Sequence, residues 1–227
     1  MLERTLRGLP DTTLFDCLAS PRRRATVTVL DDADEWLAEE TLATRVAATL
    51  SESDPEDVGS DRRRRVRTGL HHAALPKLEQ CGVIERDDDA ESVSLVDHPA
   101  LANTSLRRTI ETPSDPDTVD ALFDALAHRR RQRTVAVLGR LHHAIERREA
   151  AALVAADERD CSLQDLSESV VDEVAQSFRH VHIPKLRTAG LVRCDPEDGT
   201  VAYDDHPDFT LAWVRPDGRR SPTEASD

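Results

Sequence analysis

Side chains able to contact a nucleic acid are concentrated in one basic segment. Four consecutive arginines, Arg62 to Arg65, are followed within two helical turns by further basic and hydroxyl side chains. Arginine binds guanine edges and phosphates bidentately, and threonine and histidine can bond to base edges or phosphates. The segment predicts contact with double-stranded DNA, and its groove-facing residues would be Arg63, Arg64, Arg67, Thr68, His71 and His72.

A second interpretation of this segment stays open. An arginine-rich helix in an Asp-rich chain is often a solvated face whose guanidinium groups pair with carboxylates of the same chain. The acidic run Arg86-Asp87-Asp88-Asp89-Ala90-Glu91 would have the wrong sign for touching phosphates. In molar salt, moreover, counterion release contributes little affinity, so that a binder must depend on short-range base contacts and shape.

Other chemistry finds little support in the residue spacing. Adjacent histidines on a helix point about 100° apart, so neither His71-His72 nor His142-His143 makes an i, i+4 ligand face. The four cysteines contain no Cys-x-x-Cys pair and are interpreted as small packing residues. No phosphate-binding loop, zinc-protease motif or nucleophile elbow occurs. We therefore expect no metal, no cofactor and no enzymatic activity.

The elements that position the basic segment occur twice in the chain. Leu14 to Ala19 returns 108 residues later as Leu122 to Ala127, and the same offset continues without a gap. It aligns Pro76-Lys77-Leu78 with Pro184-Lys185-Leu186, Gly82 with Gly190, and Asp97-His98-Pro99 with Asp205-His206-Pro207. A period this long indicates a domain duplication. We predict copy one over 12–103, a linker over 104–119, copy two over 120–211 and a disordered tail over 212–227.

Each copy is expected to be mainly α-helical and to end in a small β-hairpin. The apolar spacing predicts two short helices that meet at a basic corner, then a third helix and a long fourth helix. Pro76 and Pro184 lie inside the fourth helix, where a kink and a break are both open. Gly82 and Gly190 should end it in the left-handed region, before a strand, an acidic turn and a second strand.

The basic corner itself also has two interpretations. Arginines recur there in both copies, as Arg22-Arg23-Arg24 and as Arg129-Arg130-Arg131 with Arg133. They could clamp a phosphate near a helix start, or they could pair with local acids such as Asp16 and Asp124. The structural role is the favoured one.

Two segments resemble a known family. Leu122-Phe123-Asp124-Ala125-Leu126-Ala127 with its arginine corner, and His182-Ile183-Pro184-Lys185-Leu186-Arg187-Thr188-Ala189-Gly190-Leu191-Val192, resemble a winged-helix domain family of unknown function from halophilic archaea. More remotely, the layout is similar to ArsR-like regulators, whose cysteine metal-sensing motif has no match here. The resemblance covers both copies and implies tandem winged helix-turn-helix domains. Copy one has Ala74 where the family histidine is His182 in copy two.

The winged-helix resemblance implies that the fourth helix lies in the major groove. Copy two carries Val170 to Ala175 opposite the arginines of copy one, and only Arg179 and His180 are weaker counterparts. Copy one should therefore dominate DNA contact, and copy two would form a homodimer or bind a protein partner. We predict a DNA-binding transcriptional regulator; the alternative is a non-catalytic protein-interaction or dimerisation module that does not bind DNA.

Composition indicates where such a protein works. The net charge is −14, Lys77 and Lys185 are the only lysines, and aromatic residues are 3% of the chain. Many carboxylates with few lysines are typical of proteins kept soluble in concentrated salt, and scarce aromatics disfavour stacking on single strands. No apolar run approaches the roughly 20 residues that span a bilayer, and the start lacks a signal-peptide core. We expect a halophilic, archaeal, cytoplasmic protein with no membrane association.

Overall fold

The computed structural model describes residues 12–141, 143–195 and 197–214, which form two compact units. The first unit consists of residues 12–127 with 207–209, and the second of residues 128–206 with 210–214. The units therefore do not divide at the boundaries of the two copies, because the first helix of copy two belongs to the first unit.

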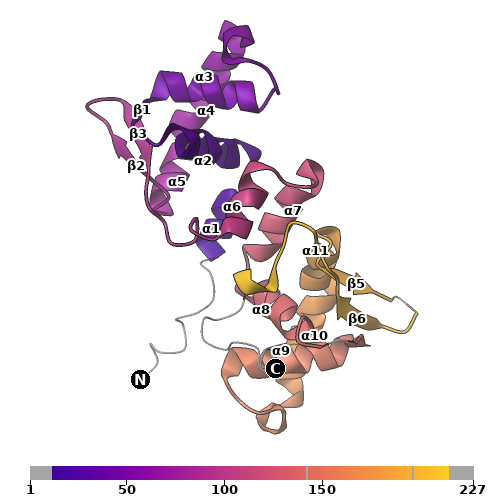
Figure 1. Cartoon of the computed structure of the whole chain (residues 1–227). Helices are drawn as coiled ribbons and strands as arrows, with labels where there is room; N and C mark the ends of the chain where they lie inside the picture. The colour runs from indigo at the N-terminus through magenta and orange to yellow at the C-terminus, as the bar shows by residue number, and fades with distance from the viewer. Residues whose placement is uncertain (1–11, 142, 196, 215–227) are drawn as a thin grey trace, which may run out of the picture. The chain divides into compact units, whose positions relative to one another are not determined.

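The first unit is mainly helical and contains one small sheet (Figure 1). Its helices are α1 (Thr12–Leu18), α2 (Pro21–Ala33), α3 (Glu39–Thr49), α4 (Ser60–Gly69), α5 (Leu75–Gln80), α6 (Thr104–Glu111) and α7 (Pro116–Leu126). Its strands are β1 (Leu37–Ala38), β2 (Ile84–Asp87) and β3 (Ser92–Leu95). A 3-10 turn, Pro55–Asp57, lies in the polar insert before α4.

The second unit repeats this order from the second helix of its copy onward. Its helices are α8 (Arg129–Leu138), α9 (Arg147–Arg159), α10 (Glu168–Ser177) and α11 (Ile183–Thr188). Its strands are β4 (Ile145–Glu146), β5 (Val192–Cys194) and β6 (Thr200–Tyr203), and its 3-10 turns are Leu163–Asp165 and Leu211–Trp213. The predicted helical copies that end in small hairpins are confirmed.

Each hairpin is joined by a third, very short strand that the sequence did not suggest. The sheet orders are β1-β3-β2 and β4-β6-β5, and all pairs are antiparallel. Leu37 pairs with Val93, and the equivalent Ile145 pairs with Val201. A strand of two residues is too short to produce an alternating pattern. In both copies it nevertheless places the start of the third helix beside the hairpin.

In both copies the long fourth helix does not break at its proline but contains a π-helical turn directly before it. Leu70–Ala74 is π-helical in copy one, and the Leu75 N–H bonds to the Leu70 carbonyl, five residues back. Phe178–His182 does the same in copy two, where the Ile183 N–H bonds to Phe178. A π turn changes the hydrogen-bond partners just before the proline, which has no N–H to donate.

The predicted left-handed glycines are confirmed at the end of each fourth helix. Gly82 has φ of 69° and Gly190 has φ of 67°. In copy one the Gly82 N–H bonds to Glu79 O (2.9 Å) and the Val83 N–H bonds to Leu78 O (3.0 Å), which caps two helix carbonyls. This cap sets where the β2–β3 hairpin begins.

Helix α7 is held to the first unit by α1 and α2. Phe15 and Phe123 occupy equivalent positions in the two copies, and their rings stack with centroids 6.2 Å apart. Arg24 is buried beside them: its Nη2 lies 2.6 Å from Asp120 Oδ1, and its Nη1 donates to Leu18 O at 2.8 Å. Its guanidinium carbon is 5.7 Å from the Phe123 ring centroid. These contacts explain why α7 packs in the first unit.

The predicted linker contains helix α6, whose first N–H groups are capped by Asn103. The end of copy two also returns to this unit, because the buried Asp208 carboxylate accepts the Ser114 and Asp115 N–H groups. Of the predicted tail, Trp213 and Val214 are buried, while 215–227 lie outside the described residues.

Among the described residues, no helix has the length and apolar character that crossing a bilayer requires.

Candidate nucleic-acid interface

A hollow of 740 Å³ in the first unit brings together most of the predicted DNA-contacting residues of copy one. We call it the arginine hollow. It is lined by Glu39, Arg64, Arg67, Thr68, His71, His72, Arg86, Asp88 and Glu91. One wall is α4 with its π turn, and the other residues come from α3 and the β2–β3 hairpin. The sequence pattern thus predicted the helical wall, but not the other lining residues.

Packing decides which face of α4 is exposed. Val66, Leu70 and Ala74 recur every four residues and are buried. Arg64, Arg67, Thr68, His71 and His72 are exposed. The rings of His71 and His72 meet edge to face, with centroids 4.9 Å apart. The amphipathic pattern therefore presents the predicted set to solvent along about two turns of helix.

The ion pairs made by the helical arginines are solvent-exposed. Arg64 Nη2 is 2.5 Å from Asp61 Oδ1, and these side chains are 77% and 78% exposed. Arg67 Nη2 is 3.8 Å from Glu91 Oε2 in the hairpin. Exposed pairs contribute about 0–1 kcal/mol, so they can be exchanged for other partners at little cost. Part of the second interpretation is correct, because these arginines do pair with carboxylates of the chain.

A much less exposed ion pair also lines the hollow. Glu39, the first residue of α3, accepts from Arg86 Nη2 at Oε1 (3.0 Å), and its Oε2 lies 3.1 Å from His71 Nδ1. The Glu39 and Arg86 side chains are only 10% and 15% exposed. They join α3, β2 and the π turn, and so fix the width of the hollow. Their separation in the chain kept sequence reasoning from finding them; the only hint is the charge reversal from Glu39 to Arg147 in copy two.

Three predicted residues lie outside the hollow. Arg63 is partly buried, and its Nη2 donates to Val58 O at 3.2 Å, which braces the insert before α4. Arg179 and His180 are exposed on the π turn of the second unit. On α10, Asp172 replaces Arg64 of copy one and pairs with Arg148.

The corner arginines make structural contacts. Arg23 donates to the carbonyls of Asp16 (2.9 Å) and Cys17 at the end of α1. In copy two, Arg130 donates two hydrogen bonds to the Glu158 carboxylate, from Nε to Oε1 at 2.7 Å and from Nη2 to Oε2 at 2.8 Å. These contacts favour the structural interpretation of the corner: Arg23 meets the backbone carbonyl of Asp16, and Glu158 is an acid that the sequence did not suggest.

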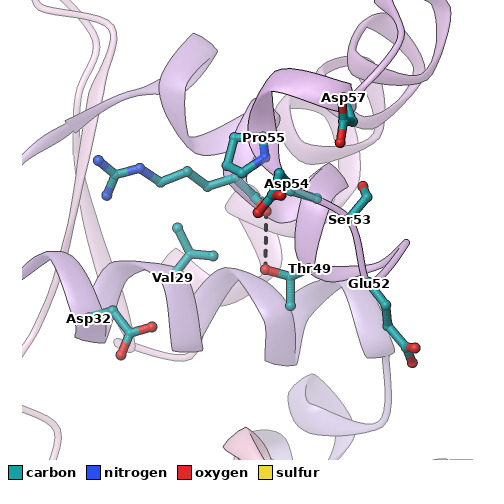
Figure 2. A pocket seen from close by; sticks show the side chains of 10 residues that line it. Val29, Asp32, Thr49, Glu52, Ser53, Asp54, Pro55 and Asp57 are labelled. Atoms are coloured by element: carbon teal, nitrogen blue, oxygen red, sulfur yellow. Dashed lines mark hydrogen bonds between the residues drawn. The ribbon is translucent and has the colours of Figure 1, made fainter.

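A second hollow of the first unit has the opposite electrostatic character. It measures 690 Å³ and lies among α2, α3 and the insert that follows α3 (Figure 2). Four carboxylates, from Asp32, Glu52, Asp54 and Asp57, line it together with Arg45. This lining repels a phosphate, so the arginine hollow is the better candidate for DNA contact.

His182 is a packing residue of the second unit. It is buried against Phe178, its ring centroid is 4.7 Å from that of His128, and no partner reaches its Nδ1. Burial, then the nearby His128, Arg130 and Arg131, lower the pKa of His182 to about 4. Among residues that the structure describes, no group of three His, Cys, Asp or Glu side chains could hold a metal ion.

Comparison with known proteins gives one family match. The family model described as "Domain of unknown function (DUF7344)" matches residues 15–94 and 123–202. No curated protein and no solved structure matches the chain.

Proposed function

We propose that this chain, which belongs to the family Domain of unknown function (DUF7344) and carries two copies of its domain, is a DNA-binding transcriptional regulator. The observation that carries the proposal is the arginine hollow. It gathers Arg64, Arg67, Thr68, His71 and His72 on the solvent face of one helix. These side chains offer bidentate donors for guanine and phosphate together with smaller polar contacts.

The order of elements supports a winged helix-turn-helix interpretation of each copy. In copy one, α3 and α4 follow one another around the short insert, and the β2–β3 hairpin comes next with β1 at its edge. In a helix-turn-helix protein the second of the two helices enters the major groove. This assignment makes α4 the groove helix and the hairpin the wing.

The distribution of charge supports α4 of copy one, and not α10 of copy two, as the helix that contacts DNA. The Arg64–Asp61 and Arg67–Glu91 pairs are exposed, so phosphates or guanine edges can replace the carboxylates cheaply. The Glu39–Arg86 pair is largely buried and stays in place, holding the wing against the helix. On α10 the equivalent positions carry Asp172 and Ala175. Binding in concentrated salt would rest on these short-range contacts.

The proposal is tested by selecting bound duplexes from a random-sequence pool in molar potassium chloride. The full-length chain should enrich a defined sequence. The Arg64→Glu/Arg67→Glu variant should retain the selected duplex at least about tenfold less well, since each bidentate arginine–guanine contact contributes ~1–3 kcal/mol. Circular dichroism of the variant checks that α4 still folds.

A charge-matched control separates groove contact from net charge. Arg108→Glu/Arg159→Glu changes the charge equally at two exposed positions outside the arginine hollow and should leave retention unchanged. The proposal of a DNA-binding regulator is contradicted if no sequence is enriched, or if both double variants retain the selected duplex equally well.

A protein-interaction or dimerisation module is the second candidate, favoured by exposed apolar side chains in copy two. Leu163 and Val181 are large, apolar and exposed in the second unit. If that candidate is correct, replacing both by Ser abolishes self-association in sedimentation experiments, while Arg64→Glu/Arg67→Glu has no effect on it. DNA selection then yields no enriched sequence.

A further inference from the structure

Two cysteines that lie far apart in the sequence meet in the first unit. Cys17 is in α1 and Cys81 directly follows α5, and the two thiols lie close enough to act on each other electrostatically. Cys81 Sγ also lies 3.6 Å from the carbonyl oxygen of Thr13, one helical turn before Cys17. Both cysteines are free thiols in this structure. Two neighbouring thiols can be oxidised as a pair, a chemistry that the interpretation of the cysteines as small packing residues does not include.

Copy two lacks both members of the pair. The equivalents of Cys17 and Cys81 are Ala125 and Ala189, and both alanines are buried. The fold of the domain therefore needs only small side chains at these two positions, and the thiols are not required for packing. Their joint presence in copy one, in contact, is what a function of the pair would need.

The two thiols differ in access, and cations lie beside them. Cys17 is fully buried, whereas Cys81 is partly exposed. Lys77 pairs with Asp16 (2.8 Å), and Arg23 donates to the Cys17 carbonyl, so two positive charges lie near the sulfur atoms. Burial and the neighbouring Cys81 raise the pKa of the Cys17 thiol to about 12, while Arg23 and Lys77 act in the opposite direction. Cys81 is thus the thiol that a small oxidant meets first.

We propose that Cys81 and Cys17 form a reversible disulfide when the protein meets a hydroperoxide. The Cys81 sulfur attacks the terminal peroxide oxygen and the O–O bond breaks, which leaves Cys81 as a sulfenic acid. The other peroxide oxygen takes up the proton of the Cys81 thiol and departs as an alcohol or water. Cys17, after losing its proton, then attacks the sulfur of the Cys81 sulfenic acid; the S–S bond forms and hydroxide leaves as water. The two thiols lose two electrons in total, which reduce the one peroxide bond. A dithiol reductant reverses the reaction.

The bond would fasten α1 to the end of the helix that carries the arginine hollow. Cys81 immediately precedes Gly82, where the helix stops and the hairpin starts. The disulfide would cross-link α1 to the end of the fourth helix of copy one. Copy two has Ala125 and Ala189 at these positions and cannot form this bond. The inference does not depend on DNA binding.

The test uses the full chain treated with hydrogen peroxide, then alkylated, digested and mapped by mass spectrometry. The Cys161→Ala/Cys194→Ala variant leaves only the proposed pair. Peroxide should remove both of its free thiols together and yield one peptide pair that links Cys17 to Cys81, and dithiothreitol should restore both thiols. The Cys81→Ala variant should leave Cys17 unreacted, because Cys17 is buried.

The unmodified chain provides the readout should a variant fail to fold, since the 17–81 peptide pair can be mapped there directly. The Cys17→Ala/Cys81→Ala variant, which carries the residues of copy two, is the matched negative control. Oxidation of Cys81 to sulfinic acid with Cys17 still reduced would overturn the proposal. So would thiol loss confined to Cys161 and Cys194, or no thiol loss before unfolding.

Discussion

Glu39 and Arg86 form an ion pair that joins α3 to the hairpin, with a distance of 3.0 Å between Glu39 Oε1 and Arg86 Nη2. The other carboxylates near Arg86 are those of Asp88 (3.5 Å) and Glu79 (4.0 Å), and both of these acidic side chains are much more exposed. The strongest bond of the Arg86 guanidinium is therefore to Glu39. It is the contact on which the shape of the arginine hollow depends.

Replacing Glu39 by Ala should destabilise the first unit by about 2 kcal/mol, because it leaves the largely buried Arg86 guanidinium without its main partner. Urea unfolding followed by Trp36 fluorescence measures this in a Trp213→Phe background, since Trp36 belongs to the first unit. Adding Arg86→Ala should cost less than the sum of the single changes, as coupled partners do. Strict additivity of the two changes would contradict the coupling.

The stability of the second unit should fall as the pH is lowered from about 6.5 toward 4. Burial and the positive neighbours of His182 lower its pKa to about 4, and the pKa of His128 is also lowered, by burial and then by Arg131 and Arg130. Between the unfolded pKa of ~6.5 and the folded one, the unfolded chain binds more protons, so acid favours unfolding. The expected loss due to His182 is on the order of 2 kcal/mol.

His182→Ala, which introduces the residue that copy one has at position 74, should flatten this pH dependence. The measurement is urea unfolding by Trp213 fluorescence in a Trp36→Phe background at a series of pH values. His180→Ala is the matched control, because His180 is exposed on the same π turn. A pH profile that is the same with and without His182 would show that its burial does not drive the effect.

The buried Asp208 carboxylate should stabilise the first unit. It accepts the Ser114 N–H at both oxygens (2.9 Å each) and the Asp115 N–H at 3.4 Å. Asp208→Ala leaves these N–H groups without their acceptor and should cost about 2 kcal/mol in the free energy of unfolding. Asp205→Ala, at an exposed aspartate three residues earlier, should change it by less than ~0.5 kcal/mol. Equal effects of both variants would count against this account.

Lysine should not replace Arg130 without loss of stability in the second unit. Its guanidinium makes two parallel bonds to Glu158 and a third to Ser177 Oγ (3.2 Å), and lysine offers no planar fork for this geometry. Arg130→Lys should lower the melting temperature of the second unit, corresponding to ~1–2 kcal/mol. Calorimetry of this variant beside Arg159→Lys, at an exposed position of α9, makes the comparison. No difference between the two would show that the fork geometry is unimportant.

Local patterns in the sequence were enough for most of the fold. The 108-residue offset reveals two copies, the apolar periodicity locates their helices, and Gly82 and Gly190 mark where the fourth helices end. These features could be predicted because each depends on residues within a few positions of one another. The exposed face of α4 and its π turn, with Arg64, Arg67, Thr68, His71 and His72, follows from the same periodicity.

Tertiary packing decided the remaining features, because they join residues that are far apart in the chain. The Glu39–Arg86 pair, the thiol contact of Cys17 with Cys81 and the stacking of Phe15 on Phe123 each join different elements. No spacing rule reports such contacts. The sequence by itself determined two copies, their helices and an arginine-bearing helix face. Only the folded chain, in which apolar burial brings remote elements together, decided that α7 joins the first unit and what surrounds that face.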